Sequence, residues 1–252
     1  MGTVCSKDTT ADSASRDVVA APVKKADSPK KKAAVLLAGN GVYDGSECTE
    51  TVSILIHLDK HGAEISNFAP TMKHTHIVDH TAGEPMEDES RCVLKESARI
   101  ARGKIADIST LKAEDFDVLL IPGGFGVAKN LSSFAFDGAD MKVIPEVERV
   151  LKEFHAAKKP IGFACIAPIL GSRVFPGAEL TVGKKTGDDW PYQGTAEACE
   201  KMGAKIIEKE KDQWHVDKAN KFVSAPSYMN ANTPYGIYTN LGNLVTETLK
   251  LA

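Results

Sequence analysis

Short apolar runs that end in small-residue turns constrain the fold of this chain more than any other feature. The three clearest runs lie at 33–38, 116–121 and 161–164. Runs of this length are typical of central parallel strands that are buried on both faces. Segments with apolar residues at helical spacing alternate with the strands, at 47–61, 144–157 and 234–251. This alternation predicts an α/β fold with a mostly parallel sheet and helices on both faces.

The remaining elements fit the same plan. Further strands are predicted at 65–69, 178–182 and 205–208, helices at 89–102 and 195–202, and an antiparallel hairpin at 214–216 and 221–225. The segment 70–87 is polar and contains His74, His76 and His80. We expect a solvated loop here rather than a metal site, because no cysteine and few acidic residues accompany these histidines.

The overall composition is that of an ordinary globular protein, with 252 residues and a net charge of −3. We expect a single domain over 33–252 and no nucleic-acid partner, because the chain has no excess of basic residues. The five cysteines are scattered and form no CxxC pair, which indicates a reducing compartment. No stretch approaches the roughly 20 apolar residues of a membrane span.

The first 32 residues differ from the rest, since they contain no aromatic residue and no helical apolar stripe. We expect 1–32 to be disordered, because such a segment cannot bury enough apolar area to offset its ordering entropy. Its start fits the N-myristoylation template, with Gly2 as acceptor and Ser6 at the hydroxyl position, and Cys5 could carry a palmitoyl group. Two acyl chains predict peripheral membrane association and a cytoplasmic, membrane-anchored protein. A chance match of so short a motif is the alternative.

Cys165 stands directly after the apolar run 161–164 and before a second apolar segment at 166–170. This placement predicts a nucleophile elbow, a tight strand-to-helix turn that presents the side chain at the edge of the sheet. The following helix N-terminus favours the thiolate, so we expect a lowered pKa for the thiol. A buried structural cysteine is the alternative interpretation.

Two glycines and two glutamates follow other strands and are expected at the same edge of the sheet. Gly123 and Gly124 allow the main chain to approach a ligand and to present amides to an oxyanion. Glu47 and Glu50 lie three residues apart at the start of a helix, so one carboxyl could bond the Cys165 sulfur or act as a general acid/base. A plain turn and a stabilising helix-start acid are the simpler interpretations.

Three stretches together resemble the ElbB family of glyoxalase-like proteins, within the class I glutamine-amidotransferase-like (PfpI/ThiJ) superfamily. They are Gly41-Val42-Tyr43-Asp44-Gly45-Ser46-Glu47, Pro122-Gly123-Gly124-Phe125-Gly126-Val127-Ala128-Lys129-Asn130-Leu131 and Gly162-Phe163-Ala164-Cys165-Ile166-Ala167-Pro168. The resemblance runs from about 33 to 251 and implies a flavodoxin-like three-layer sandwich. The stretch Trp190-Pro191-Tyr192 resembles the eukaryotic, often mitochondrial, branch, which makes a mitochondrial location the alternative.

The resemblance also implies roles for these residues. Cys165 matches the reactive cysteine and Glu50 its carboxyl partner, while Gly123, Gly124 and the Ile166 amide match the oxyanion pocket. Glu47 is a further substrate-binding candidate. The superfamily resemblance implies a homodimer, and the route expected below needs neither a metal nor an organic cofactor. No histidine occupies 181–184, where superfamily members with a Cys–His pair have one, and this argues against glutamine hydrolysis.

The function expected from these observations is that of a cofactor-independent glyoxalase or deglycase, a glyoxalase III-type lyase/hydrolase, with glyoxal and methylglyoxal as small carbonyl substrates. The Cys165 thiolate would form a hemithioacetal, Glu50 would move a proton between the carbons, and water would release a 2-hydroxy acid. The alternative is a redox-sensing or scaffold protein with weak catalysis, tethered to a membrane. The absent histidine and the acylation motif favour that alternative.

Overall fold

The computed structural model describes residues 30–252 of the chain. The predictions for Gly2 and Cys5, and most of the predicted disordered segment, lie outside the described residues. The first strand, β1 (Lys32–Leu36), begins one residue before the predicted domain boundary. None of the helices described between residues 30 and 252 is long and apolar enough to cross a membrane.

A seven-stranded sheet forms the centre of the fold, with the order β10-β11-β7-β6-β1-β2-β5. The strands other than β1 are β2 (Glu64–Ala69), β5 (Ile105–Asp107), β6 (Val118–Ile121), β7 (Ile161–Ala164), β10 (His215–Asp217) and β11 (Phe222–Ala225). Neighbouring strands are parallel except β10 and β11, which form the predicted antiparallel hairpin. The chain runs outward from β1 in both directions across the sheet. The carboxyl ends of β1, β6, β7 and β11 therefore meet at one edge.

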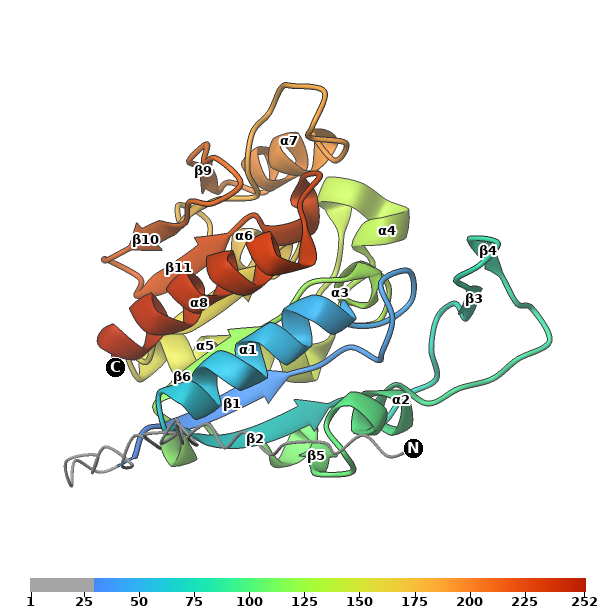
Figure 1. Cartoon of the computed structure of the whole chain (residues 1–252), viewed down its shortest axis with the longest axis horizontal. Helices are drawn as coiled ribbons and strands as arrows, with labels where there is room; N and C mark the ends of the chain where they lie inside the picture. The colour runs from blue at the N-terminus through green and yellow to red at the C-terminus, as the bar shows by residue number, and fades with distance from the viewer. Residues whose placement is uncertain (1–29) are drawn as a thin grey trace, which may run out of the picture.

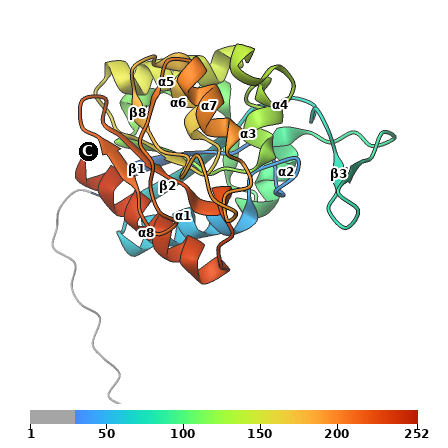
Figure 2. The ribbon, with the colours of Figure 1, turned by 90° about the horizontal axis from the view of Figure 1, so that it is seen from above.

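Helices cover both faces of this sheet, which confirms the predicted three-layer α/β fold (Figures 1 and 2). On one face, α1 (Cys48–Lys60) packs against α8 (Pro234–Lys250). The other face carries α5 (Pro145–Ala156) and α6 (Pro168–Val174). The other helices are α2 (Val93–Ile100), α3 (Phe125–Lys129), α4 (Phe134–Asp137) and α7 (Gly194–Lys201), with 3₁₀ turns at Ile108–Thr110, Ala113–Asp115, Gly138–Asp140 and Ser227–Met229.

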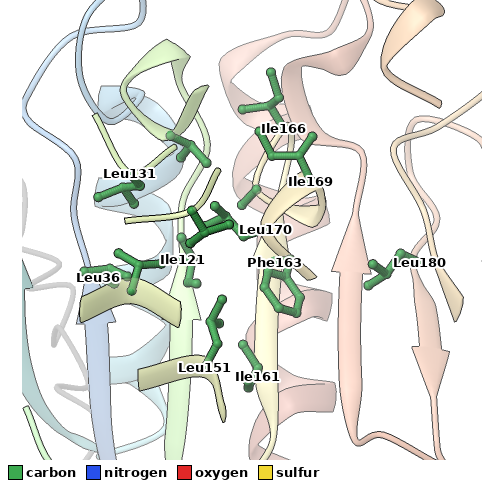
Figure 3. Close-up of a cluster of buried hydrophobic side chains, with 14 of the residues drawn as sticks. Leu36, Ile121, Leu131, Leu151, Ile161, Phe163, Ile166, Ile169, Leu170 and Leu180 are labelled. Carbon is green, nitrogen blue, oxygen red and sulfur yellow. The ribbon is translucent and has the colours of Figure 1, made fainter. Parts of the chain in front are cut away.

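The core divides into two clusters because alternate residues of each strand point to opposite faces of the sheet. Val35 and Leu120 face α1 and α8. Figure 3 shows the opposite cluster, in which the labelled residues include Leu36, Ile121, Leu151, Phe163 and Leu170. All four residues of β6 and of β7 are buried, because helices cover these strands on both sides.

Several segments differ from the sequence prediction. The strands β8 (Glu179–Leu180) and β9 (Lys205–Ile206) pair only with each other, in a separate two-stranded sheet. The strand β5 was not predicted, and it forms one edge of the main sheet. The polar excursion contains a short hairpin of β3 (Val78–Asp79) and β4 (Glu84–Pro85), which projects from the body of the fold (Figure 1).

The expectation of a solvated loop for the three histidines is wrong for His74, which is 4% exposed. Its ring packs against Gly39 and lies 3.4 Å from the side-chain nitrogen of Asn130, a residue 56 positions later. Asn130 is itself buried and donates to the carbonyls of Ala38 and Asp44, at 2.9 and 2.8 Å. The excursion is therefore anchored to the turn after β1 through this buried polar cluster.

Candidate functional site

Cys165 occupies the turn between β7 and α6, with the main chain in the left-handed region at a φ of 57°. This conformation is costly for a residue with a Cβ and occurs where surrounding structure enforces it. The Cys165 N–H donates to the carbonyl of Ala225 at 2.9 Å, so the neighbouring strand β11 holds the turn. The side chain is 7% exposed. The structure thus has the predicted strand–turn–helix geometry, with a sulfur that only just reaches the surface.

Glu50 lies in the first turn of α1, has no exposed surface and hydrogen-bonds the Cys165 sulfur. Its two carboxyl oxygens also accept main-chain bonds, from the Gly123 N–H at 2.8 Å and from the Tyr228 N–H at 3.3 Å. Glu47 is the N-cap of the same helix and accepts the Glu50 N–H at 2.6 Å. The carboxyl group of Glu50 is thereby fixed behind the sulfur by segments that are distant in the sequence.

The protonation of Glu50 follows from this burial. Loss of hydration raises its pKa from 4.5 to about 8, the nearby charge of Glu47 adds to this effect, and the two amide donors oppose it. The carboxyl group is consequently protonated at neutral pH. A protonated carboxyl can donate its hydrogen bond to the sulfur, which a carboxylate cannot do.

The expected lowering of the Cys165 pKa is not what the structure shows. Burial raises the pKa of the thiol well above its ordinary value, and a negative charge on Glu50 would raise it further. Hydrogen bonds from the Gly124 and Ile166 amides to the sulfur lower it, but by less than burial raises it. The short helix α6 begins only at Pro168, so the turn places the sulfur in an apolar setting more than in the field of a helix N-terminus.

The two glycines, to which the sequence assigned one role, have different surroundings. The Gly123 amide is not an oxyanion donor, because it is bonded to Glu50. A Cβ at Gly123 would overlap that of Cys165 and lie 2.9 Å from its sulfur, so only glycine fits there. Gly124 has a φ of 96°, and its amide and that of Ile166 both point to the sulfur. If a carbonyl carbon became bonded to the sulfur, these two amides could donate hydrogen bonds to its oxygen.

A pocket of about 310 Å³ opens onto the sulfur. Its lining residues are Val42, Tyr43, Glu47, Gly124, Phe125, Cys165, Ile166, Tyr192, Tyr228 and Met229. Glu47 is the carboxylate in this wall, whereas Glu50 is not part of it. No pocket tyrosine was predicted from the sequence, although Tyr43 and Tyr192 stand within the motifs that carry the family resemblance. Tyr228 follows β11 and carries no such signal.

The wall of this pocket, as residues 30–252 form it, includes three tyrosines and no histidine, and the segment 181–184 is not part of it. His215, the last histidine of the chain, pairs with Glu179 at 3.3 Å in the β8–β10 region. Between residues 30 and 252, no group of three or more His, Cys, Asp or Glu side chains is arranged to hold a metal ion. The groups that surround the Cys165 thiol are the carboxyls of Glu47 and Glu50 and the main-chain amides of Gly124 and Ile166.

A cysteine in a strained turn at the carboxyl edge of a parallel sheet, with a buried carboxyl behind its sulfur, defines an amidotransferase-like α/β protein. The chain belongs to the ES1 protein family. It is 52% identical over 225 residues to "ES1 protein homolog, mitochondrial" of Rattus norvegicus, and the match covers 88% of this chain and 85% of that protein. It is equally similar to "Glutamine amidotransferase-like class 1 domain-containing protein 3, mitochondrial" of Homo sapiens, with 88% and 84% covered.

Solved structures share the fold of this chain. An isoprenoid biosynthesis protein with an amidotransferase-like domain from Ehrlichia chaffeensis superposes with a TM-score of 0.80 at 34% identity, covering 88% of this chain and 99% of the other. A DJ-1 superfamily protein from Salmonella typhimurium shares the fold, with a TM-score of 0.52 at 18% identity and 87% and 91% of the chains covered. No protein-family model matches the chain.

Proposed function

We propose that this protein is a cofactor-independent enzyme of the glyoxalase or deglycase type that acts on small reactive carbonyls. The observation that carries the proposal is the arrangement at the base of the pocket, where the Cys165 sulfur meets two amide donors in front and a protonated Glu50 behind. A carbonyl carbon bonded to this sulfur would place its oxygen near the amides of Gly124 and Ile166.

In the first step, the thiol adds across the aldehyde. The S–C bond forms, the C=O π bond breaks, and the thiol proton goes to the carbonyl oxygen to give a hemithioacetal. Because Glu50 is protonated at neutral pH, it can donate its hydrogen bond to the sulfur and so stabilise the negative charge that develops there as the thiol proton leaves.

The second step needs a base that reaches the substrate carbon. Glu50 is unsuited to this task, because it is fully buried and both its oxygens accept main-chain bonds. We therefore assign the proton transfer to Glu47, whose side chain lines the pocket. Glu47 removes the proton from the former aldehyde carbon and returns it to the neighbouring carbon, while the hydroxyl proton of the hemithioacetal moves to the neighbouring carbonyl oxygen. The product is a thioester of the 2-hydroxy acid. Water then cleaves the C–S bond and restores the thiol, so the net reaction adds one water and needs no oxidant.

The experiment is product formation from glyoxal and methylglyoxal, with Cys165 confirmed as reduced by intact mass. We expect Cys165→Ser to abolish turnover and Glu47→Gln to lower kcat by roughly 10²–10⁴-fold. Cys48→Ser is the matched control, since Cys48 is exposed and outside the pocket wall, and it should keep wild-type turnover. Wild-type turnover in Cys165→Ser would refute the proposal.

A second candidate function is a redox sensor, which the histidine-free pocket wall favours. The raised pKa of the Cys165 thiol counts against it, because redox-sensing cysteines react with peroxide as thiolates. In this case hydrogen peroxide would oxidise Cys165 to the sulfenic acid with release of water, while carbonyl turnover stayed at the uncatalysed rate. Selective oxidation of Cys165 over the exposed Cys48, without turnover, would support the sensor and count against the enzyme.

For location, we propose the mitochondrion, because the relatives above and an ES1 protein of Danio rerio at 36% identity are all named mitochondrial. Acylation at Gly2 and Cys5 stays a competing prediction, as does the homodimer. Comparing wild type with Gly2→Ala in cell fractions separates the two locations. A shift of the variant from membrane to soluble fractions would support the anchor, and mitochondrial recovery of both forms would support import.

A further inference from the structure

A second cavity, of about 410 Å³, adjoins the cysteine pocket. Its lining residues are Tyr43, Val78, Gly83, Pro85, Phe125, Ala128, Lys129, Phe134, Ala135, Ile166, Tyr192 and Thr195. Four of them, Tyr43, Phe125, Ile166 and Tyr192, also line the cysteine pocket, so the two compartments have a common wall. Tyr43 and Tyr192 are 40% and 41% exposed, which leaves these two side chains room to move.

The walls of the second cavity are mainly aromatic and aliphatic, and Lys129 carries the charge in them. The Lys129 ammonium donates to the carbonyl of Tyr43 at 2.8 Å and lies 5.6 Å from the centre of the Phe125 ring. Burial lowers the pKa of Lys129, while the charge of Asp44 opposes this effect. No carboxylate of residues 30–252 lies within 4.0 Å of this ammonium. The cavity thus offers a positioned cation without an anionic partner.

We propose that the two compartments form one site for carbonyl compounds with an apolar tail that ends in a carboxylate. The aldehyde group lies at Cys165, the tail crosses the wall of Tyr43, Phe125 and Tyr192, and the carboxylate pairs with Lys129. This inference rests on the proposed carbonyl chemistry of Cys165, but it adds the substrate class. A molecule the size of methylglyoxal would occupy only the first compartment, without contact with the cation.

Charge complementarity selects this class of tail. The cysteine pocket already contains the carboxylate of Glu47, which would repel an anionic group bound next to the sulfur. Lys129 lines the second cavity and can attract such a group there, where a charge-assisted hydrogen bond in a half-buried site contributes more than on the open surface. The two ends of the ligand therefore lie beside opposite charges of the protein. The aldehyde end is near the Glu47 carboxylate, and the carboxylate end is near the Lys129 ammonium.

The test measures alkylation of Cys165 by intact mass and peptide mapping, because this readout does not need turnover. Three probes share one reactive group: iodoacetamide, N-phenyliodoacetamide and N-(4-carboxyphenyl)iodoacetamide. Each rate is divided by the rate of the same probe with a free thiol in solution. We expect the carboxyphenyl probe to have the highest normalised rate, and Lys129→Met to lower that rate by about tenfold while the iodoacetamide rate stays unchanged.

Two further variants complete the design. Ala135→Trp, at an exposed position in the cavity wall, should slow both aryl probes and leave iodoacetamide unchanged. Lys142→Met removes an exposed lysine that lines neither compartment and should change none of the rates. Equal normalised rates for the three probes, or a carboxyphenyl rate that Lys129→Met does not alter, would overturn the inference. If methylglyoxal is not turned over but the probe preference persists, the proposed reaction fails while the two-compartment site stands.

Discussion

Replacing Glu50 by Gln tests the protonation of the site through the stability of the fold. Burial raises the pKa of Glu50 from 4.5 to about 8, so between these values the folded protein keeps a proton that the unfolded chain has released. The unfolded state binds fewer protons in this window, and the free energy of unfolding therefore falls as the pH rises through it. Gln has a similar shape but does not titrate.

The magnitude follows from the size of the shift. The full difference in pKa corresponds to about 5 kcal/mol, because each unit is worth about 1.36 kcal/mol. Between about pH 5 and pH 8, we expect wild type to lose roughly 3–4 kcal/mol of stability that the Glu50→Gln variant keeps. The Cys165 thiol, with its raised pKa, stays protonated over this range and adds little to the difference.

The assay is reversible urea unfolding of both proteins at several pH values and constant ionic strength, with Glu64→Gln as an exposed control. The stability curves of wild type and Glu50→Gln should diverge as the pH rises, while the control follows wild type. Parallel curves would refute the reasoning. They would mean that the folded pair has already released one proton, so that Cys165 is a thiolate beside a protonated Glu50.

Three further substitutions test the packing around the site. Gly123→Ala should cost about 1–3 kcal/mol and slow alkylation of Cys165, because the added methyl overlaps the cysteine; urea unfolding and intact mass measure the two effects. Asn130→Ala should cost about 2–4 kcal/mol in urea unfolding, since two buried carbonyls lose their donor. Gly183→Ala should lower the melting temperature, because at a φ of 98° its methyl would overlap the Trp190 ring.

Each of these substitutions has an outcome that counts against the structural explanation. Wild-type alkylation in Gly123→Ala would show that the turn has more space than the structure gives it. A cost below 1 kcal/mol for Asn130→Ala would mean that other donors replace the amide. An unchanged melting temperature in Gly183→Ala would show that the Trp190 ring has another position available.

The central strands could be predicted because their signal is local. The strand β7 has the predicted bounds, since its four apolar residues lie between Pro160 and the turn at Cys165. The strand β5 escaped prediction because it is three residues long and only half-buried at the sheet edge. The strands β8 and β9 were predicted, but their separate sheet was not. A pairing of only two residues in each strand leaves no sequence signal that shows which sheet the strands belong to.

For the site, the sequence indicated which residues lie together, but it did not reveal their hydrogen bonds. Cys165, Glu50 and Gly124 were all expected at one edge of the sheet, and the structure brings them together. The Gly123 amide donates to Glu50, which is 73 residues away in the sequence. A local motif does not reveal so distant a partner, so this amide was predicted to be free for an oxyanion. The direction of the Cys165 pKa was also missed, since a local turn motif does not show how completely distant segments exclude water.

The groups around the Cys165 sulfur come from segments that the ribosome produces far apart in time. Glu50 and Gly124 precede the cysteine, but Ala225 and Tyr228, which hold the turn and the carboxyl group, are made near the end of the chain. At roughly 5–20 residues per second, several seconds of translation separate the cysteine from these partners. During that interval β7 lacks its neighbour β11, and the thiol of the nascent chain is open to cellular oxidants. Oxidation of this cysteine should therefore depend on how recently the protein was made as well as on the oxidant concentration.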